Sequence, residues 1–326
     1  MDILKDKVIL LTGGTGSFGN KFVESALKKH NPKAIRVFSR GEKKQLDMMS
    51  KFKDDERARF FIGDVRDKER LHRAMTDADI VVHAAALKQV PACEYNPIEA
   101  VRTNVDGAIN IIDSAIDNGV ERVIAISTDK AVHPVNLYGA TKMTAEKLFI
   151  QGNSYSGKVD TKFSCVRYGN VIGSRGSVIP LFMEQKKKGV ITITDKKMTR
   201  FWIKLEQGVD FVIDCITKMK GGEIFIPKIP SMKIIDLAEV IAPEAEKKVV
   251  GIRPGEKIHE ILLTEDEARH SKELNDCYVI EPEHSFWTKE RHIAGGKKLP
   301  EGFRYTSEKN TKWFSKNELV KIIKEL

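Results

Sequence analysis

The chain has 326 residues, of which 41% are hydrophobic, so it can bury one large core or two unequal ones. Its 55 basic side chains exceed the 46 acidic ones by nine, but they are scattered rather than gathered into the stripe that nucleic-acid binding needs. No apolar run is long enough to cross a bilayer, and four widely spaced cysteines indicate neither a disulfide framework nor a zinc site.

These properties favour a cytoplasmic protein with reduced thiols, no bound metal, and neither a nucleic-acid nor a membrane partner. A strand-like run begins almost at the first residue, and nothing before it resembles a secretion signal. The weak positive charge favours an anionic ligand such as a nucleotide diphosphate.

Six short apolar runs alternate with helix-period stretches in the first half of the chain. They occupy residues 7–13, 34–40, 58–64, 78–86, 122–128 and 162–170. Near-continuous apolar strands separated by helices indicate a parallel sheet covered on both faces. We therefore predict the α/β class, with a doubly wound parallel Rossmann sheet and a smaller, discontinuous α/β substrate lobe.

The segment from Ile98 to Ile116 shows the helical pattern most clearly. Its apolar residues recur every three or four positions, as a helix packed on a sheet requires. Gly119 supplies the stop signal. We predict a helix over this segment.

Regular alternation breaks down after about residue 170, where proline and glycine punctuate the sequence. We predict a Rossmann domain over residues 1–170, rejoined by about 201–226, because the helix-like run at 205–219 and the strand-like run after it could return to the first sheet. Residues 171–200 and 227–326 would then form the substrate-binding lobe and a C-terminal extension.

A glycine-rich turn, TGGTGSFG, joins the first predicted strand to the first predicted helix. Glycine permits a tight turn and lets a pyrophosphate approach backbone amides at the helix start. The alternative is a structural turn without a ligand. In the cofactor reading, the turn contributes Gly13, Gly16, Ser17, Phe18 and Gly19.

The end of the second strand favours NADP over NAD. An acidic side chain usually stands there in NAD sites, whereas this chain has Arg40 followed by Lys43 and Lys44. Arginine can pair with a 2′-phosphate, although these cations could also be ordinary surface residues. Further cofactor contacts are predicted for Asp64, which could instead cap the next helix, and for Val65 and Ala84.

The reacting centre is predicted where the fifth strand ends, at Thr128. Tyr138 and Lys142 follow as Tyr-x-x-x-Lys at the start of the next helix and share one face of it. We expect the ammonium of Lys142 to hold the nicotinamide ribose and to lower the pKa of the phenol from about 10. The phenolate could then take a proton from a sugar hydroxyl while hydride leaves for the cofactor.

Several long motifs in the same order identify a family resemblance. The motifs at residues 59–67, 83–91, 127–142, 167–180, 198–202 and 251–260 resemble those of the inverting UDP-N-acetylglucosamine 4,6-dehydratases. This family lies within the extended short-chain dehydrogenase/reductase superfamily and begins pseudaminic acid synthesis in some bacteria. The resemblance implies a hydro-lyase that acts on a UDP-sugar with NADP and works as a homo-oligomer, either a dimer or a hexamer.

The pair Asp129-Lys130 carries the mechanistic part of the resemblance. It implies that Tyr138 assists oxidation at C4, Lys130 removes the C5 proton, and Asp129 protonates the departing 6-hydroxyl, with Thr128 beside them. We expect the pKa of Lys130 to fall towards about 7–8 through burial or through a nearby charge such as Lys88, because only a neutral amine is a base. In isolation the pair would be an ordinary loop ion pair.

Two alternatives remain at this stage: a UDP-hexose 4-epimerase, which needs no such pair, and a non-catalytic NADP-binding regulator. The resemblance also implies that Lys88 and Asn170 approach the sugar and diphosphate. Further substrate contacts are implied for Arg175 and Arg200 at the phosphates, for Arg253 and Glu256 over the uridine, and for Met198.

Overall fold

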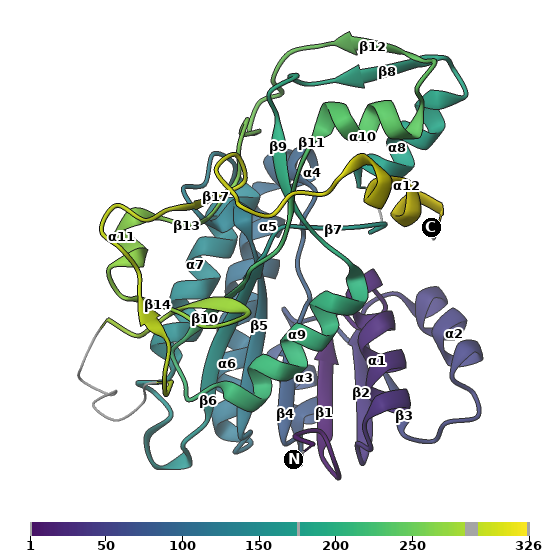
Figure 1. Ribbon diagram of the computed structural model, residues 1–326. Coiled ribbons are helices and arrows are strands. Elements are labelled where there is room, and N and C mark those ends of the chain that lie inside the picture. Colours follow the sequence, from purple (N-terminus) through teal and green to yellow (C-terminus); the bar gives the residue numbers. More distant parts are fainter. Residues whose placement is uncertain (1, 175–176, 284–292, 325–326) are drawn as a thin grey trace.

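The computed structural model describes residues 2–174, 177–283 and 293–324 (Figure 1). The described residues form a ten-stranded sheet in the order β16-β14-β15-β10-β6-β5-β4-β1-β2-β3. The strands from β3 to β10 pair in parallel, and β15, β14 and β16 continue the sheet antiparallel at one edge. The predicted α/β class with a doubly wound parallel sheet is confirmed. The strands are β1 (Val8–Thr12), β2 (Ala34–Ser39), β3 (Ala58–Ile62), β4 (Ile80–His83), β5 (Arg122–Thr128), β6 (Lys162–Tyr168), β10 (Ile224–Pro227), β14 (Ser271–Glu273), β15 (Cys277–Ile280) and β16 (Lys297–Lys298).

Helices cover both faces of this sheet, which explains the apolar character of its central strands. Every residue of β1 and β4 is buried, because each side chain meets a helical layer on one face or the other. One layer pairs α1 with α9, and the other brings α3, α6 and α7 together (Figure 1). The helices are α1 (Ser17–Lys29), α2 (Glu42–Lys51), α3 (Lys68–Met75), α4 (Val90–Tyr95), α5 (Pro97–Val101), α6 (Gly107–Asp117), α7 (Leu137–Gly152) and α9 (Leu205–Lys218), with 3-10 turns at η2 (Asp129–Ala131) and η3 (Gly157–Val159).

A second hydrophobic cluster lies above the carboxyl ends of the parallel strands (Figure 1). It is centred on the buried Trp202 and draws on α8, α10 and α12, which pack with two small sheets, β11-β9-β7 and β12-β8. The division of the chain into two domains stays a prediction. The remaining elements are β7 (Asn170–Val171), α8 (Val178–Lys186), β8 (Val190–Ile193), β9 (Thr199–Ile203), β11 (Ser231–Lys233), α10 (Ile234–Ile241), β12 (Glu246–Val249), β13 (Ile261–Leu263), α11 (Glu265–Ala268), β17 (Tyr305–Thr306) and α12 (Lys316–Lys324).

The helix predicted from Ile98 to Ile116 is interrupted by a π-helical turn, η1 (Arg102–Asp106). The wider turn lies between α5 and α6 and buries Asn104. Its amide donates to the carbonyl of Leu87 at 2.9 Å, and its oxygen accepts from the Leu87 amide at 2.8 Å. The apolar repeat predicted the helix correctly, but it carries no signal for this local rearrangement, which fixes the segment after β4.

All four cysteines are buried free thiols. Burial raises the pKa of each thiol. Within the described ranges, no helix has the length and apolar content that a transmembrane span requires.

A buried ion triad ties α7 and β6 to α11. The side chain of Arg167 on β6 is only 3% exposed, and its Nη2 lies 2.7 Å from Oε2 of Glu146 and 2.9 Å from Oε1 of Glu267. Its Nη1 also donates to the carbonyl of Leu262. Arg167 and Glu146 are almost fully desolvated, so each is tolerated there only because the opposite charge lies beside it.

Replacing Arg167 with Met should therefore lower the free energy of unfolding by about 3–5 kcal/mol, since Glu146 would stay buried without its cation. Urea unfolding followed by circular dichroism measures the change. Arg269→Met is the matched control, because the Arg269 side chain is 69% exposed beside Asp266 and should contribute little. Equal losses in the two variants would contradict a stabilising role for the triad.

Candidate active site

A cleft of about 1260 Å³ opens at the carboxyl ends of the parallel strands and is closed on its far side by the lobe around Trp202. Ligands of doubly wound sheets bind at this edge. Most of the residues predicted from the sequence line it, namely Gly13, Gly16, Ser17, Phe18, Arg40, Asp64, Val65, Ala84, Lys88, Thr128, Lys130, Tyr138, Lys142, Asn170, Met198, Arg200, Arg253 and Glu256.

Three predicted residues are placed differently, and a fourth is not described. Gly19 lies inside α1, where a Cβ would come within 2.2 Å of the Gly14 carbonyl oxygen, so it serves the packing of the turn. Lys43 is exposed on α2 and is not among the residues lining the cleft. Asp129 is fully buried behind the cleft surface, and Arg175 lies outside the described residues.

The start of α1 fits an anionic group. Its N-cap is Gly16, which has no side chain to accept from the first amides of the helix. These amides face the part of the cleft lined by the glycine turn. A pyrophosphate placed there would receive hydrogen bonds and the favourable end of the helix dipole.

Cations gather beside the end of β2. Arg40 and Lys44 line the cleft, and the guanidinium of Arg40 lies 3.8 Å from Asp64. Burial acts to raise the pKa of Asp64, but its hydrogen bonds with Arg66 outweigh this and lower it. The helix-capping alternative for Asp64 is wrong, because Asp67 caps α3 by accepting from the amide of Arg70.

The turn η2 carries Asp129 and Lys130, the predicted acid–base pair. Thr128 ends β5, and its hydroxyl donates to Oδ1 of Asp129 at 3.0 Å. The ammonium of Lys130 donates to the same oxygen, also at 3.0 Å. The second oxygen of Asp129, Oδ2, is buried without a hydrogen-bond partner among the described residues.

The first turn of α7 holds this pair in place. A Cβ on Gly139 would lie 2.2 Å from the carbonyl oxygen of Lys130, so only glycine permits the close approach of α7 to η2. Asn136 caps α7 by accepting from the Gly139 amide at 2.8 Å. Its own amide donates to the carbonyl of Gly255 at 2.7 Å and so connects α7 to the loop that carries Arg253 and Glu256.

Tyr138 and Lys142 do not act on each other as expected. Burial raises the pKa of Tyr138 to about 12. The charge of Lys130 and a hydrogen bond from Thr128 act in the opposite direction and lower the pKa. The ammonium of Lys142 instead donates to the carbonyl of Ile126 at 2.7 Å. Burial lowers the pKa of Lys142.

The expected fall in the pKa of Lys130 is also wrong for this structure. Burial acts to lower it, but the nearby carboxylates of Asp129 and Glu260 outweigh burial, and the pKa is raised. The expected repulsion between Lys88 and Lys130 lowers the pKa of Lys88 instead: burial lowers it most, and the charge of Lys130 lowers it further. Lys130 is therefore an ammonium in the free protein.

Arg200 makes contacts that the sequence did not predict. Its Nη1 donates to the carbonyls of Thr199 and Ile258, and its Nη2 donates to that of Lys257. The guanidinium thus holds the segment before β13, and its role at the phosphates stays a prediction. Glu260, in the same segment, also lines the cleft, and the sequence analysis did not predict it as a site residue. The sequence signal that could have identified it is the group of ionisable residues at the end of the motif at 251–260.

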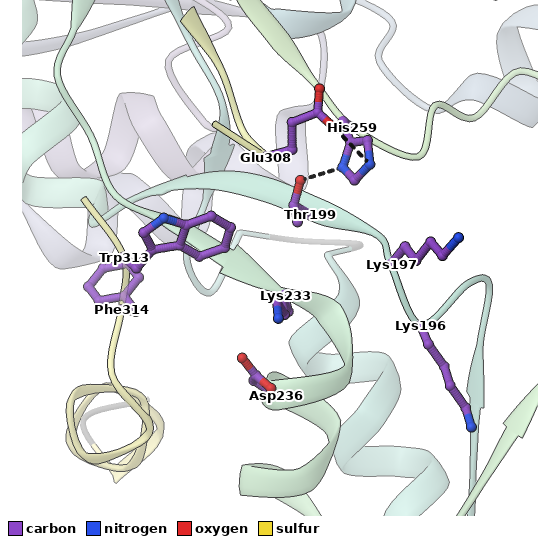
Figure 2. Close-up of a pocket in the computed structure, with 9 residues that line it drawn as sticks. All are labelled: Lys196, Lys197, Thr199, Lys233, Asp236, His259, Glu308, Trp313 and Phe314. Atoms are coloured by element: carbon purple, nitrogen blue, oxygen red, sulfur yellow. Dashed lines mark hydrogen bonds and ion pairs between the residues drawn. The ribbon is translucent and has the colours of Figure 1, made fainter. Parts of the chain in front are cut away.

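A second cavity, the outer pocket, has a volume of about 760 Å³ and lies on the other side of β9 (Figure 2). Thr199 lines the outer pocket while its neighbour Arg200 lines the cleft. His259 contacts Thr199 at 2.8 Å and Glu308 at 3.1 Å. Figure 2 shows Lys196 and Lys197 directed away from the rings of Trp313 and Phe314, so the cations of this pocket do not converge on one point.

Comparisons with known proteins match nearly the whole chain to relatives that carry two different named activities. A family model described as polysaccharide biosynthesis protein matches residues 9–282. The inverting UDP-N-acetylglucosamine 4,6-dehydratase of Campylobacter jejuni is 50% identical over 325 residues, 97% of each chain. The UDP-glucose 4-epimerase of Rickettsia conorii is 42% identical over 98% of this chain and 95% of its own. The X-ray structure of Pen from Bacillus thuringiensis matches with a TM-score of 0.91 and 40% identity, covering 99% of this chain and 98% of its own.

Asn136 offers a test of how the cleft is built. Asn136→Ala should lower the free energy of unfolding by about 1 kcal/mol, because the α7 cap is lost. It should also speed hydrogen exchange in residues 251–256, because the bond to Gly255 is lost. Asn136→Asp keeps the capping oxygen but not the amide donor, so it should be more stable than the alanine variant and show the same faster exchange. Unchanged exchange in both variants would show that the bond to Gly255 does not hold the loop.

Proposed function

Because the chain belongs to the polysaccharide biosynthesis protein family and is 50% identical to the inverting dehydratase of Campylobacter jejuni, we propose that it is an NADP-dependent UDP-N-acetylglucosamine 4,6-dehydratase that inverts C5. The enzyme is a hydro-lyase in this assignment. Its product is a UDP-2-acetamido-2,6-dideoxy-L-arabino-hexos-4-ulose.

One observation carries the proposal: Lys130 and Tyr138 line the same cleft, and the ammonium of Lys130 pairs at 3.0 Å with Asp129, which is buried directly behind the cleft surface. A 4-epimerase needs acid–base help at C4 alone, whereas a 4,6-dehydratase must also remove the C5 proton and protonate the leaving hydroxyl at C6. The similarity to epimerases along the chain keeps that activity as the second candidate.

The residues of the cleft fit a dinucleotide. The uncapped start of α1 would hold the pyrophosphate, and Arg40 with Lys44 stands where a 2′-phosphate would lie. When bound, NADP supplies a hydride acceptor for C4 and returns the same hydride to C6.

Tyr138 takes the proton from the 4-hydroxyl in the first step. It can do so only as the phenolate, so its own proton must first leave to solvent. Burial opposes this loss, because it raises the pKa of Tyr138 to about 12. Lys130 on η2 and Thr128, which caps that turn, both stabilise the phenolate and so favour proton removal at C4. Lys142 positions its ammonium at the carbonyl of Ile126, next to the ribose end of the cofactor site.

Asp129 and Lys130 reach their working forms by exchanging one proton. The Nζ proton of Lys130 already points at Oδ1 of Asp129. Its transfer gives a neutral amine and a carboxylic acid without changing the charge of the cleft. The amine then removes the C5 proton, which the 4-keto group has made acidic, and the acid protonates the 6-hydroxyl as it leaves as water.

A proton supplied by solvent then adds to C5 on the face opposite the one from which Lys130 removed the first. This delivery inverts the centre, and hydride addition at C6 completes a methyl group.

Proton NMR of the purified protein with UDP-N-acetylglucosamine in deuterated water tests the reaction. We expect a 6-methyl, 4-keto sugar whose methyl signal is a singlet, because C5 receives deuterium from the solvent while C6 receives the hydrogen from C4. A parallel sample in ordinary water gives the configuration at C5.

A C4 epimer that retains its 6-hydroxyl would establish the epimerase instead. A dehydrated product with unchanged C5 would refute inversion. Absence of any product, with NADP added, would reject this substrate.

The cofactor preference has its own test by calorimetry on cofactor-free protein. Lys44→Ala should raise the Kd of NADP about tenfold and leave that of NAD unchanged, because a charged contact with the 2′-phosphate is lost. Lys43→Ala is the matched control, since Lys43 does not line the cleft, and it should change neither value. Equal weakening of both cofactors by Lys44→Ala would refute NADP selection at this position.

We further propose that the product enters pseudaminic acid synthesis and that the enzyme acts in the cytoplasm as a homo-oligomer, as the family resemblance implies. Sedimentation of the purified enzyme measures its assembly, and a monomer would refute that part.

A further inference from the structure

Glu260 is a buried glutamate that the proposed mechanism does not use. It lies immediately before β13, is only 2% exposed, and lines the cleft. A carboxylate at such a position is costly unless cations compensate it. Its surroundings supply three.

The three cations converge on the Glu260 carboxylate from different parts of the chain. Oε1 lies 3.7 Å from Nζ of Lys130 and 3.7 Å from Nε of Arg200. Oε2 lies 3.5 Å from Nζ of Lys257 and has no hydrogen-bond partner among the described residues. Glu260 therefore bridges η2, β9 and its own segment through charge rather than through short hydrogen bonds.

We propose that Glu260 is a positioning residue of the reacting centre, the shared counter-ion that holds the ammonium of Lys130 and the guanidinium of Arg200 in the cleft. This inference rests on the proposed function for its role in catalysis. The contacts themselves do not depend on the substrate.

The backbone around Glu260 is fixed independently of its side chain. Its amide donates to Oγ of Ser307 at 2.9 Å, and its carbonyl accepts from the Ser307 amide at 2.8 Å. Lys257 donates to the carbonyl of Val132, directly after η2, at 2.6 Å. The carboxylate is thus presented to Lys130 by a segment that is anchored on both sides.

Glu260 also opposes release of the proton from Lys130. Its negative charge stabilises the ammonium, so removing that charge makes the neutral amine more abundant at a given pH. The charged and titratable groups that face Lys130 are Asp129 on its own turn, Tyr138 on α7, Lys88 after β4, Arg200 on β9 and Glu260 itself.

Reductive methylation measures this effect without any turnover. Formaldehyde with a borohydride reagent attacks only neutral amines, and the Lys130 side chain is 28% exposed in the cleft. At a fixed pH of about 8, Glu260→Gln should speed methylation of Lys130 about 10- to 100-fold, the equivalent of a shift of one to two pH units. Mass spectrometry of the peptide containing Lys130 gives the rate, and the exposed Lys188 serves as the internal reference.

A charge-keeping variant separates charge from packing. Glutamine matches the shape of glutamate but lacks its charge, whereas Glu260→Asp keeps the charge and shortens the side chain. If Glu260 acts as the counter-ion, Gln accelerates methylation and Asp stays close to the wild type. If Glu260 only fills space, Asp accelerates it more than Gln, and the proposal is overturned.

Two further variants complete the design. Glu267→Gln alters a half-buried glutamate, one that pairs with Arg167 and does not line the cleft, and should leave Lys130 methylation unchanged. Lys257→Met removes a competing cation from Glu260 and should slow methylation of Lys130, which keeps the test open if Glu260→Gln does not fold; faster methylation would overturn the proposal. The NMR assay separately decides whether the wild type dehydrates the sugar, so failure of the proposed function and failure of this inference are distinguishable.

Discussion

Charge balance among buried groups is the constraint on which the arrangement of the cleft around Lys130 depends. Asp129 and Glu260 are both buried, and between them stands the ammonium of Lys130. Desolvated ions are tolerated only when opposite charges lie beside them. A proton that moves between Asp129 and Lys130 therefore changes the pKa of the groups beside them, including Tyr138.

The fold brings the group together by connecting three segments that are far apart in the sequence. The turn after β5 carries Asp129 and Lys130, β9 carries Arg200, and the loop before β13 carries Glu260. Direct bonds join them: Asn136 to Gly255, Lys257 to Val132, and Arg200 to the carbonyls of 257 and 258. The lobe around Trp202 and the parallel sheet thus meet at η2, and residues from both line the cleft.

The sequence was sufficient to predict the parts of the site that follow from strand order. Parallel strands end at one edge of a sheet, so residues placed after 12, 39, 83 and 128 had to face a common cleft. It was insufficient wherever the answer depended on contacts between distant segments. Asp129, its sequence neighbour, raises the pKa of Lys130 most, but Glu260, which lies 130 positions later, adds to the rise; the raised pKa of Tyr138 depends on burial. Likewise, adjacent lysines at 43 and 44 look alike in sequence, but helix geometry places only Lys44 at the cleft.

The burial of the four thiols makes the chain a convenient host for spectroscopic labels. Because burial raises the pKa of every native cysteine and removes it from solvent, maleimides and similar reagents should react slowly with all of them. A cysteine introduced at an exposed site on each side of the cleft would then react selectively. Donor and acceptor dyes attached there would report how the distance between sheet and lobe changes as nucleotide and sugar bind.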